Sequence, residues 1–405
     1  MVPDVIWVGI DVGRYFHAIC GIDSSGHVVW ERRRVINSNW AISRALERLR
    51  HFAQDRSLRF GTEETTGNAA ALVRLLAGAN EIVYLAQPLR VHRFHLALGQ
   101  PHKSDPYDAQ VIAQFVRQNV ARLPRVRFGT PDVQALRVLS RQLESVSKDL
   151  RRCLSRLRHT LAEYAPEWLI CSPFRSWSSQ AALGILERYG RISKLRRTPV
   201  RRLAEALSRW SRGRRGEVDA RALRDAFSEV SLPPVLEEAY GRVVVSLVSQ
   251  IRHLLAEKQH LLQLIAAQAD LASAFSRLQA ESGYGLETAA TIISEVGDIR
   301  DFPLEPGFAT YCGVTPIKRS SGISQGSLRL SRFTNKRLLR AIFQATVAAA
   351  HSDPRSIAYY QMKLAGRSDP RSKVTALLAL ARHRTRRPHK LLRQCSTQQP
   401  TTSAA

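Results

Sequence analysis

The sequence predicts an N-terminal α/β domain followed by a mostly helical remainder. Short apolar runs separated by turn residues fill the first 30 positions, and apolar runs then alternate with helical patterns. Apolar residues recur every three or four positions over two long central stretches, which is typical of long amphipathic helices. In a chain of 405 residues, these differing patterns of apolar residues indicate two or three domains.

Three consecutive strands are predicted at the start of the chain. They cover 5–10, 16–22 and 28–30, and turn-forming residues separate them. Helical patterns then alternate with two further apolar runs up to about Val116. This order of elements predicts a mixed sheet with helices, and we place the domain at residues 1–128.

Residues 129–275 are predicted to form a long helical, coiled-coil-like region. One apolar seam runs from Leu136 to Leu161 and a second runs from Leu247 to Ile265. The pattern fits either an antiparallel hairpin within the chain or an oligomer interface. Between the seams, Arg191–Arg224 holds twelve Lys and Arg residues against three acidic ones, and the role of this basic insert stays open.

Residues 276–395 are predicted to form a mostly helical C-terminal domain, with a disordered tail at 396–405. Helical patterns cover 288–296 and 336–350. The segment 306–352 contains no acidic residue and seven Lys or Arg residues. A solvated helix normally mixes charges of both signs, so this bias favours a phosphate-binding surface.

Charge and composition narrow the class of partner. The chain has 61 Lys and Arg residues against 34 acidic ones, a formal net charge of +27, and 44% hydrophobic residues. This excludes disorder for the whole chain and favours a polyanion, nucleic acid above all, over a small acidic substrate. The five cysteines form no Cys-x-x-Cys pair, and no apolar run is long enough to cross a membrane. We therefore expect a cytoplasmic, nucleoid-associated protein.

Carboxylates stand where predicted strands and a helix meet loops. Asp11 ends an apolar strand, Glu63-Glu64 follows the fourth, and Asp105 and Asp108 open a helix. Oxygen ligands converging in this way suit Mg²⁺ or Mn²⁺. Each residue also has a structural interpretation, because Asp105 before a proline is a good N-cap and acids are favoured in the first helical turn. The pair His92 and His95, with no acidic neighbour in sequence, is interpreted as ordinary helix residues.

Three stretches resemble the Asp-Glu-Asp-Asp signature of insertion-sequence transposases. They are Gly9-Ile10-Asp11-Val12, Glu64-Thr65-Thr66-Gly67 and Lys103-Ser104-Asp105-Pro106-Tyr107-Asp108-Ala109. The resemblance implies a ribonuclease H-like fold for the N-terminal domain, similar to the Holliday-junction resolvase RuvC. It also implies Mg²⁺ or Mn²⁺ ligands, namely Asp11, Glu64, Asp105 and Asp108. The Glu-x-Thr-Gly pattern selects Glu64, although Glu63 stands beside it.

The C-terminal domain resembles the serine domain of the same family, which is Piv-invertase-like and guided by a bridge RNA. The matching stretches are Gly283-Tyr284-Gly285, Glu295-Val296-Gly297-Asp298, Tyr311-Cys312-Gly313-Val314-Thr315-Pro316 and Ser321-Gly322. The resemblance implies that Ser321 is a catalytic nucleophile, with Ser320 as the adjacent alternative. From the residues alone, both serines are ordinary turn formers. A serine nucleophile also needs a base or a metal, and no histidine lies nearby in sequence.

Two features of this domain predict contacts to nucleic acid. Gly283 and Gly285 resemble the hairpin of helix-hairpin-helix modules, although Gly-x-Gly is also an ordinary turn between helices. The second feature is a set of basic residues in the acid-free segment. These are Lys318, Arg319, Arg329, Arg332, Lys336, Arg337 and Arg340.

Together these features predict a DNA transposase or site-specific recombinase. It would cleave and rejoin the strands of an insertion sequence through a covalent phosphoserine link to DNA. The family resemblance implies a structured guide RNA and a homo-oligomer, a dimer or tetramer. Two alternatives stay open: a metal-dependent junction-resolving nuclease that uses water, and a DNA-binding regulator without enzymatic activity.

Overall fold

The computed structural model describes residues 4–99, 105–123, 125–126, 129–318, 328–330, 334–367 and 369–398. The chain divides into two compact units, Met1–Gly129 and Thr130–Ala405. Each unit has its own hydrophobic core, and each is described separately. Ser320, Ser321, Arg319 and Arg332 lie outside the described residues.

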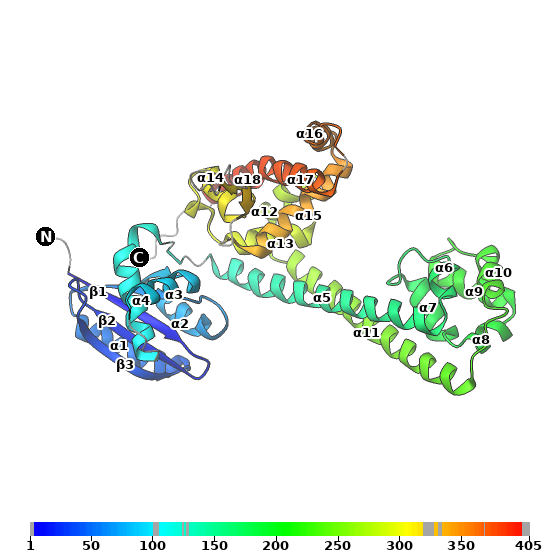
Figure 1. Ribbon diagram of the computed structural model, residues 1–405, viewed down its shortest axis with the longest axis horizontal. Helices are drawn as coiled ribbons and strands as arrows, with labels where there is room; N and C mark the ends of the chain where they lie inside the picture. The colour runs from blue at the N-terminus through cyan, green and yellow to red at the C-terminus, as the bar shows by residue number, and fades with distance from the viewer. Residues whose placement is uncertain are drawn as a thin grey trace. The chain divides into compact units, whose positions relative to one another are not determined.

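The first unit contains the predicted mixed sheet, with five strands in the order β3-β2-β1-β4-β5 (Figure 1). β1 pairs antiparallel with β2 and parallel with β4; β2 pairs antiparallel with β3, and β4 pairs parallel with β5. The three antiparallel strands at the start confirm the sequence prediction. The strands are β1 (Val5–Val12), β2 (Phe16–Ile22), β3 (Val28–Ile36), β4 (Ser57–Thr62) and β5 (Ile82–Leu85).

Helices cover both faces of this sheet. The helices are α1 (Asn39–Ala53), α2 (Ala70–Gly78), α3 (Pro88–Ala97) and α4 (Asp105–Asn119). Successive side chains of a strand point to opposite faces, so Ile6, Val8 and Ile10 pack with α1 and α2. The other face of the sheet packs against α4.

Two strand glycines let α4 lie directly against the sheet. A Cβ added to Gly9 of β1 would lie 2.0 Å from the carbonyl oxygen of Ala109 and 2.4 Å from the backbone nitrogen of Ala113. A Cβ on Gly61 of β4 would lie 2.3 Å from a methyl group of Val116. The helix backbone therefore occupies the space that strand side chains would otherwise fill.

The second unit is built along two long antiparallel helices, α5 (Pro131–Tyr164) and α11 (Pro234–Ala266) (Figure 1). Gln142 donates a hydrogen bond to Glu257 near one end, and Cys153 contacts the carbonyl oxygen of Leu247 further along. The two apolar seams thus pair within the chain, and the predicted pair of long helices is confirmed. α5 begins with an N-cap: the Thr130 side chain accepts a hydrogen bond from the Val133 amide, and Pro131 follows as the first helical residue.

A helical head packs on the end of α5 and the first half of α11. It surrounds a second core that includes Trp168 and Phe227. The basic insert forms part of the head and is helical rather than extended. The helices of the head are α6 (Glu167–Ile170), α7 (Gln180–Tyr189), α8 (Ile192–Arg197), α9 (Val200–Ser211) and α10 (Glu217–Ala226).

The C-terminal helices form a bundle that shares a core with the start of α5 and the end of α11. They are α12 (Ala272–Gln279), α13 (Leu286–Val296), α14 (Glu305–Tyr311), α15 (Lys336–Ser352), α16 (Pro354–Leu364), α17 (Pro370–Arg384) and α18 (Arg386–Gln398). A two-stranded antiparallel pair, β6 (Pro316–Lys318) and β7 (Leu328–Leu330), lies between α14 and α15 in sequence. α18 extends to Gln398, so it enters the segment 396–405 for which the sequence predicted disorder.

No helix in the described part of the chain is both long enough and apolar enough to cross a membrane.

Replacement of Gly9 by alanine is expected to destabilise the first unit. The new methyl group has to push α4 away from β1, and overpacking of this kind costs about 1–3 kcal/mol or more of unfolding free energy. Gly78 at the end of α2 is the matched control, because a Cβ there meets nothing within 4 Å. Thermal and urea unfolding followed by circular dichroism should show a loss for Gly9→Ala and none for Gly78→Ala. Equal stability of the two variants would contradict the close packing.

Candidate functional site

Asp11 and Asp108 lie on elements that pack against each other. Alternation along β1 places Asp11 on the same face as Gly9, the face covered by α4. Asp108 lies in the first turn of α4, one residue before the alanine that contacts Gly9. Both carboxylate residues are half-buried. The glycine contact thus brings together two acids that lie 97 positions apart in the sequence.

Glu63 and Glu64 follow the end of β4, beside β1 in the sheet. The buried hydroxyl of Thr62 donates to the carbonyl oxygen of Glu64 at 3.0 Å and holds the start of this turn. Glu63 is half-buried, whereas Glu64 is exposed. Burial, together with the nearby carboxylates of Asp11, Asp108 and Glu64, raises the pKa of Glu63 to about 7. The acids therefore form one cluster in which their negative charges repel each other.

The structure adds His95 of α3 to this cluster. Its Nδ1 lies 3.6 Å from a carboxylate oxygen of Asp108, and its ring packs edge-on against Tyr107. His92, one turn earlier, is exposed. Sequence reasoning missed His95 because its acidic partner comes from another helix.

The donor set fits a hard divalent cation, because carboxylate oxygens are its preferred ligands and the cluster carries excess negative charge. Asp105 begins α4, and its side chain lies outside the described residues. Among the side chains that the structure describes, no three His, Cys, Asp or Glu residues are close enough together to hold an ion.

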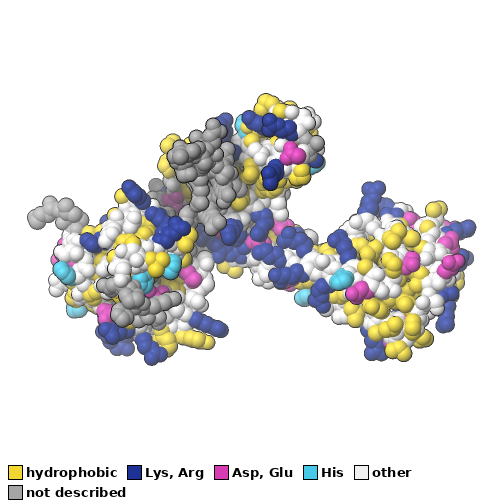
Figure 2. Space-filling view, viewed as in Figure 1, with side chains coloured by type: hydrophobic (Ala, Val, Ile, Leu, Met, Phe, Trp, Pro, Cys, Tyr) yellow, Lys and Arg dark blue, Asp and Glu magenta, His cyan; other side chains and the backbone are white. Residues whose placement is uncertain are grey.

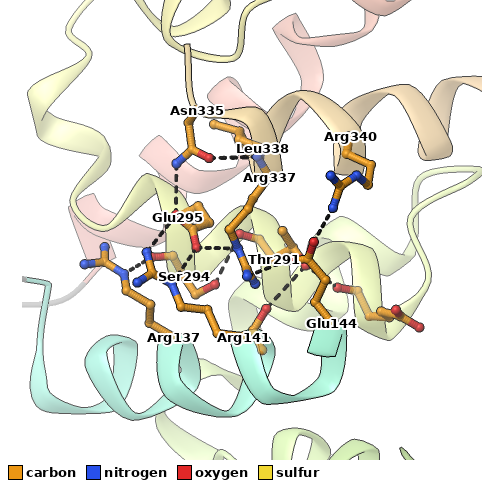
Figure 3. Close-up of polar contacts among 12 residues, drawn as sticks. Arg137, Arg141, Glu144, Thr291, Ser294, Glu295, Asn335, Arg337, Leu338 and Arg340 are labelled. Carbon is orange, nitrogen blue, oxygen red and sulfur yellow. Dashed lines mark hydrogen bonds and ion pairs between the residues drawn. The ribbon is translucent and has the colours of Figure 1, made fainter. Parts of the chain in front are cut away.

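In the second unit, the buried residue Glu295 links four helices through its carboxylate and its backbone carbonyl (Figure 3). Glu295 of α13 is 5% exposed. It accepts hydrogen bonds from Arg141 of α5 at 3.1 Å and from the Asn335 side chain at 2.9 Å. Its backbone carbonyl accepts from the Tyr311 hydroxyl of α14 at 3.1 Å.

Asn335 also caps α15, since its side-chain oxygen accepts from the amides of Arg337 and Leu338 at 3.1 Å each. Burial alone would raise the pKa of Glu295, but the hydrogen bonds from Arg141 and Asn335 and the charges of Arg141 and Arg337 lower it. Glu295 is therefore held as a carboxylate. The Glu295 cluster ties α14 to the first turn of α15, the helices on either side of the β6–β7 pair.

Two of the arginines that the sequence predicts to contact DNA form ion pairs within the chain. Arg337 lies 2.9 Å from a carboxylate oxygen of Glu295 and 2.5 Å from one of Glu144, and Arg340 also pairs with Glu144 (Figure 3). Lys336 is exposed. Lys318 lies in β6 and Arg329 in β7, where backbone pairing places Arg329 opposite Ile317. Arg319 and Arg332 lie outside the described residues.

The two glycines of the predicted hairpin have different surroundings. Gly283 has a φ of +86°, and a Cβ on it would lie 2.2 Å from the carbonyl oxygen of Ala345, so its first role is packing against α15. Gly285 is exposed at the start of α13, and a Cβ there would meet open space. Of the two, Gly285 has the backbone that a phosphate can reach.

Two protein-family models and several individual proteins match this chain. A transposase family model named for IS110 and its DEDD residues matches 8–166, and a model for the transposase IS116/IS110/IS902 family matches 276–361. A 43.6 kDa protein of insertion element IS110 from Streptomyces coelicolor is 27% identical, covering 94% of this chain and 92% of its own length. A 42 kDa protein of insertion element IS900 from Mycobacterium paratuberculosis is 25% identical over 99% of this chain and 98% of its own. A putative transposase for IS117 from S. coelicolor is 24% identical, with 88% and 87% covered.

These matches define the chain as a transposase, an enzyme that acts on DNA. Its family is that of the IS110/IS116 transposases, as the resemblance in the sequence indicates. Transposases of this type generally use divalent metal ions.

Replacement of Glu295 by glutamine is expected to lower the unfolding free energy of the second unit by about 3 kcal/mol at pH 7, because arginine charges lose a buried partner. Glu287→Gln is the matched control on the same helix. Its 2.9 Å pair with Lys258 is partly exposed to solvent and contributes at most about 1 kcal/mol.

The pH dependence has a definite sign. Folding lowers the pKa of Glu295, so its stabilisation is present above the unfolded pKa of about 4.3 and is lost as pH falls through the folded pKa. The difference between wild type and Glu295→Gln, measured by urea unfolding, should therefore shrink below about pH 4. A difference that stays constant over this range would show that the carboxylate charge has no stabilising role.

Proposed function

We propose that this transposase cleaves and rejoins the DNA strands of an insertion sequence with a carboxylate-held metal centre and a serine nucleophile. The observation that carries the proposal is the carboxylate cluster around Glu63, where burial and the acids from β1, the end of β4 and α4 raise the pKa of Glu63. The strand order β3-β2-β1-β4-β5, with three antiparallel strands first, supports a ribonuclease H-like, RuvC-like fold for this unit.

In the proposed centre, Asp11, Glu64, Asp105 and Asp108 hold the divalent ion, Mg²⁺ or Mn²⁺. A bound ion polarises the phosphodiester and stabilises its attacking and leaving oxygens. The rigid packing of α4 on β1 keeps Asp11 and Asp108 on facing elements, which limits the reorganisation needed to bind the ion. His95 restrains Asp108 from the side of α3.

Ser321 is the proposed nucleophile. Its Oγ attacks a DNA phosphorus, an Oγ–P bond forms, and the bond from phosphorus to the leaving strand oxygen breaks. Over the whole step, the proton of the serine hydroxyl passes to the oxygen of the leaving strand. A hydroxyl of a second DNA strand then attacks the same phosphorus, restores the serine and rejoins the strands. The link conserves the energy of the broken phosphodiester, so rejoining requires no other energy source.

The proposal includes a structured guide RNA and a homo-oligomer. The net charge of +27 exceeds what a short DNA contact requires and supports a large polyanionic partner. Sequencing of the nucleic acid that co-purifies with the protein at low salt tests for this RNA. Recovery of one discrete RNA species supports the guide, and recovery of random fragments contradicts it.

A covalent protein–DNA adduct is the expected product of the serine step. Wild-type protein, incubated with end-labelled element DNA, Mg²⁺ and its co-purified RNA, should retain label on a denaturing gel. Ser321→Ala should abolish the adduct, and Ser320→Ala should leave it. DNA cleavage by wild type with no adduct would instead support attack by water.

The two adjacent glutamates give a second test, because Glu63 is the more buried of the two whereas Glu64 matches the family pattern. Glu64→Gln is expected to lower the cleavage rate a hundredfold or more, since a metal-held oxygen contributes roughly several kcal/mol. Glu63→Gln should retain most of the activity. Single-turnover cleavage of labelled DNA measures both variants, and the reverse ranking would assign the ligand to Glu63.

A further inference from the structure

The helical head contains a pocket of about 480 Å³ that the proposed chemistry does not use. It lies between the segment before α7 and the turn after α9. Four arginines and two aromatic residues contribute to its lining, and no carboxylate does. The lining residues are Phe174, Arg175, Ser176, Ser179, Gln180, Ala181, Trp210, Ser211, Arg212, Arg214 and Arg215.

The arginines make the pocket electropositive. Arg175 and Arg212 are exposed, and neither forms an ion pair with a carboxylate in the described part of the chain. Arg215 is partly neutralised by Asp219 at 3.0 Å, and Arg214 donates to the Ser211 carbonyl at 3.1 Å. Lys and Arg side chains are also visible around the margin of the head in Figure 2. Two unpaired guanidinium groups at one pocket are a suitable arrangement for phosphate.

The aromatic residues of the pocket are held in place. Trp210 packs so closely on α7 that a Cβ on Gly184 would lie 2.4 Å from its ring. Phe174 packs edge-on against the buried Trp177, with ring centroids 5.9 Å apart. A fixed aromatic surface beside free cations is pre-organised for a planar ring that is flanked by negatively charged groups.

The backbone at Arg212 is strained. Arg212 ends α9 in the left-handed conformation, with φ +56°, and Gly213 follows with φ +78°. Glycine adopts this conformation at little cost, whereas other residues lose roughly 1 kcal/mol. Glycine is therefore compatible with the backbone at this position, which makes Arg212→Gly a suitable variant for testing the arginine side chain.

We propose that this pocket binds an unpaired nucleotide within a nucleic-acid strand. The base stacks on the aromatic lining, and Arg175 and Arg212 contact the flanking phosphates. A paired base is stacked inside its helix and cannot enter, so the pocket distinguishes single strands from duplexes. The basic insert thereby has a binding role that is separate from the carboxylate cluster and independent of the proposed serine step.

The test uses the full-length protein and photochemical cross-linking to a 20-nucleotide RNA that contains 5-iodouridine. A cross-linked peptide that contains Trp210 or Phe174, identified by mass spectrometry, is the expected result. The double variant Arg175→Gln/Arg212→Gly should lose most of this cross-link. For single strands, the slope of log K against log salt should fall by about 0.7 for each phosphate contact removed. DNA of the same sequence tests whether the strand has to be RNA.

The double variant should not lose thermal stability, because glycine suits the backbone at position 212. Arg201→Gln is the matched control on α9, where Arg201 pairs with Glu205 outside the pocket, and it should keep the cross-link. The proposal is overturned if cross-links map only elsewhere or if the double variant keeps its yield. It is also overturned if an equimolar duplex, or free uridine monophosphate at the same concentration, competes as well as the single strand.

Discussion

The first unit depends on one close contact, the packing of α4 on β1 at Gly9. No side chain separates the helix backbone from the strand there, so the start of α4 and the end of β1 lie together. Asp11 and Asp108 flank this contact, and β4 places Glu63 and Glu64 at the same end of the sheet. Repulsion among these acids is an energetic cost that the fold carries. A cation can offset that cost, which supports the metal centre proposed for this cluster.

In the second unit, some arginines stabilise the fold through ion pairs, and others have no acidic partner nearby among the described residues. Glu144 and Glu295 compensate Arg141, Arg337 and Arg340, so part of the basic surface is used to hold α15 against α5 and α13. In the head, by contrast, Arg175 and Arg212 lie at a pocket without an acidic partner among its lining residues. A high net charge therefore does not identify the nucleic-acid surface by itself. The uncompensated arginines identify it better.

Much of the fold could be predicted because it is encoded locally. Short apolar runs separated by turn residues indicated the first three strands, and the three-to-four-residue seams indicated α5 and α11. The seams could not show that these helices pair within one chain, since an intermolecular pair has the same pattern. The helical continuation of α18 to Gln398 was not expected, because the sequence there is a polar tail.

The site was only partly predictable, for a physical reason. Asp11, Glu64, Asp105 and Asp108 were predicted as ligands because they stand at element ends and match a family pattern. Glu63, His95 and Glu295 gain their roles from partners on other elements, and no spacing in the sequence records those contacts. Gly9 carried a readable signal, since a glycine inside an apolar strand often marks close approach of another backbone.

The most direct test of the metal centre is anomalous diffraction from crystals of the full-length protein grown with Mn²⁺. The account predicts a peak between β1 and the start of α4, with oxygens of Asp11 and Asp108 about 2.1 Å away. The peak should be absent from crystals of the Asp11→Asn variant grown under the same conditions. Mn²⁺ bound only elsewhere in wild-type crystals would contradict the account.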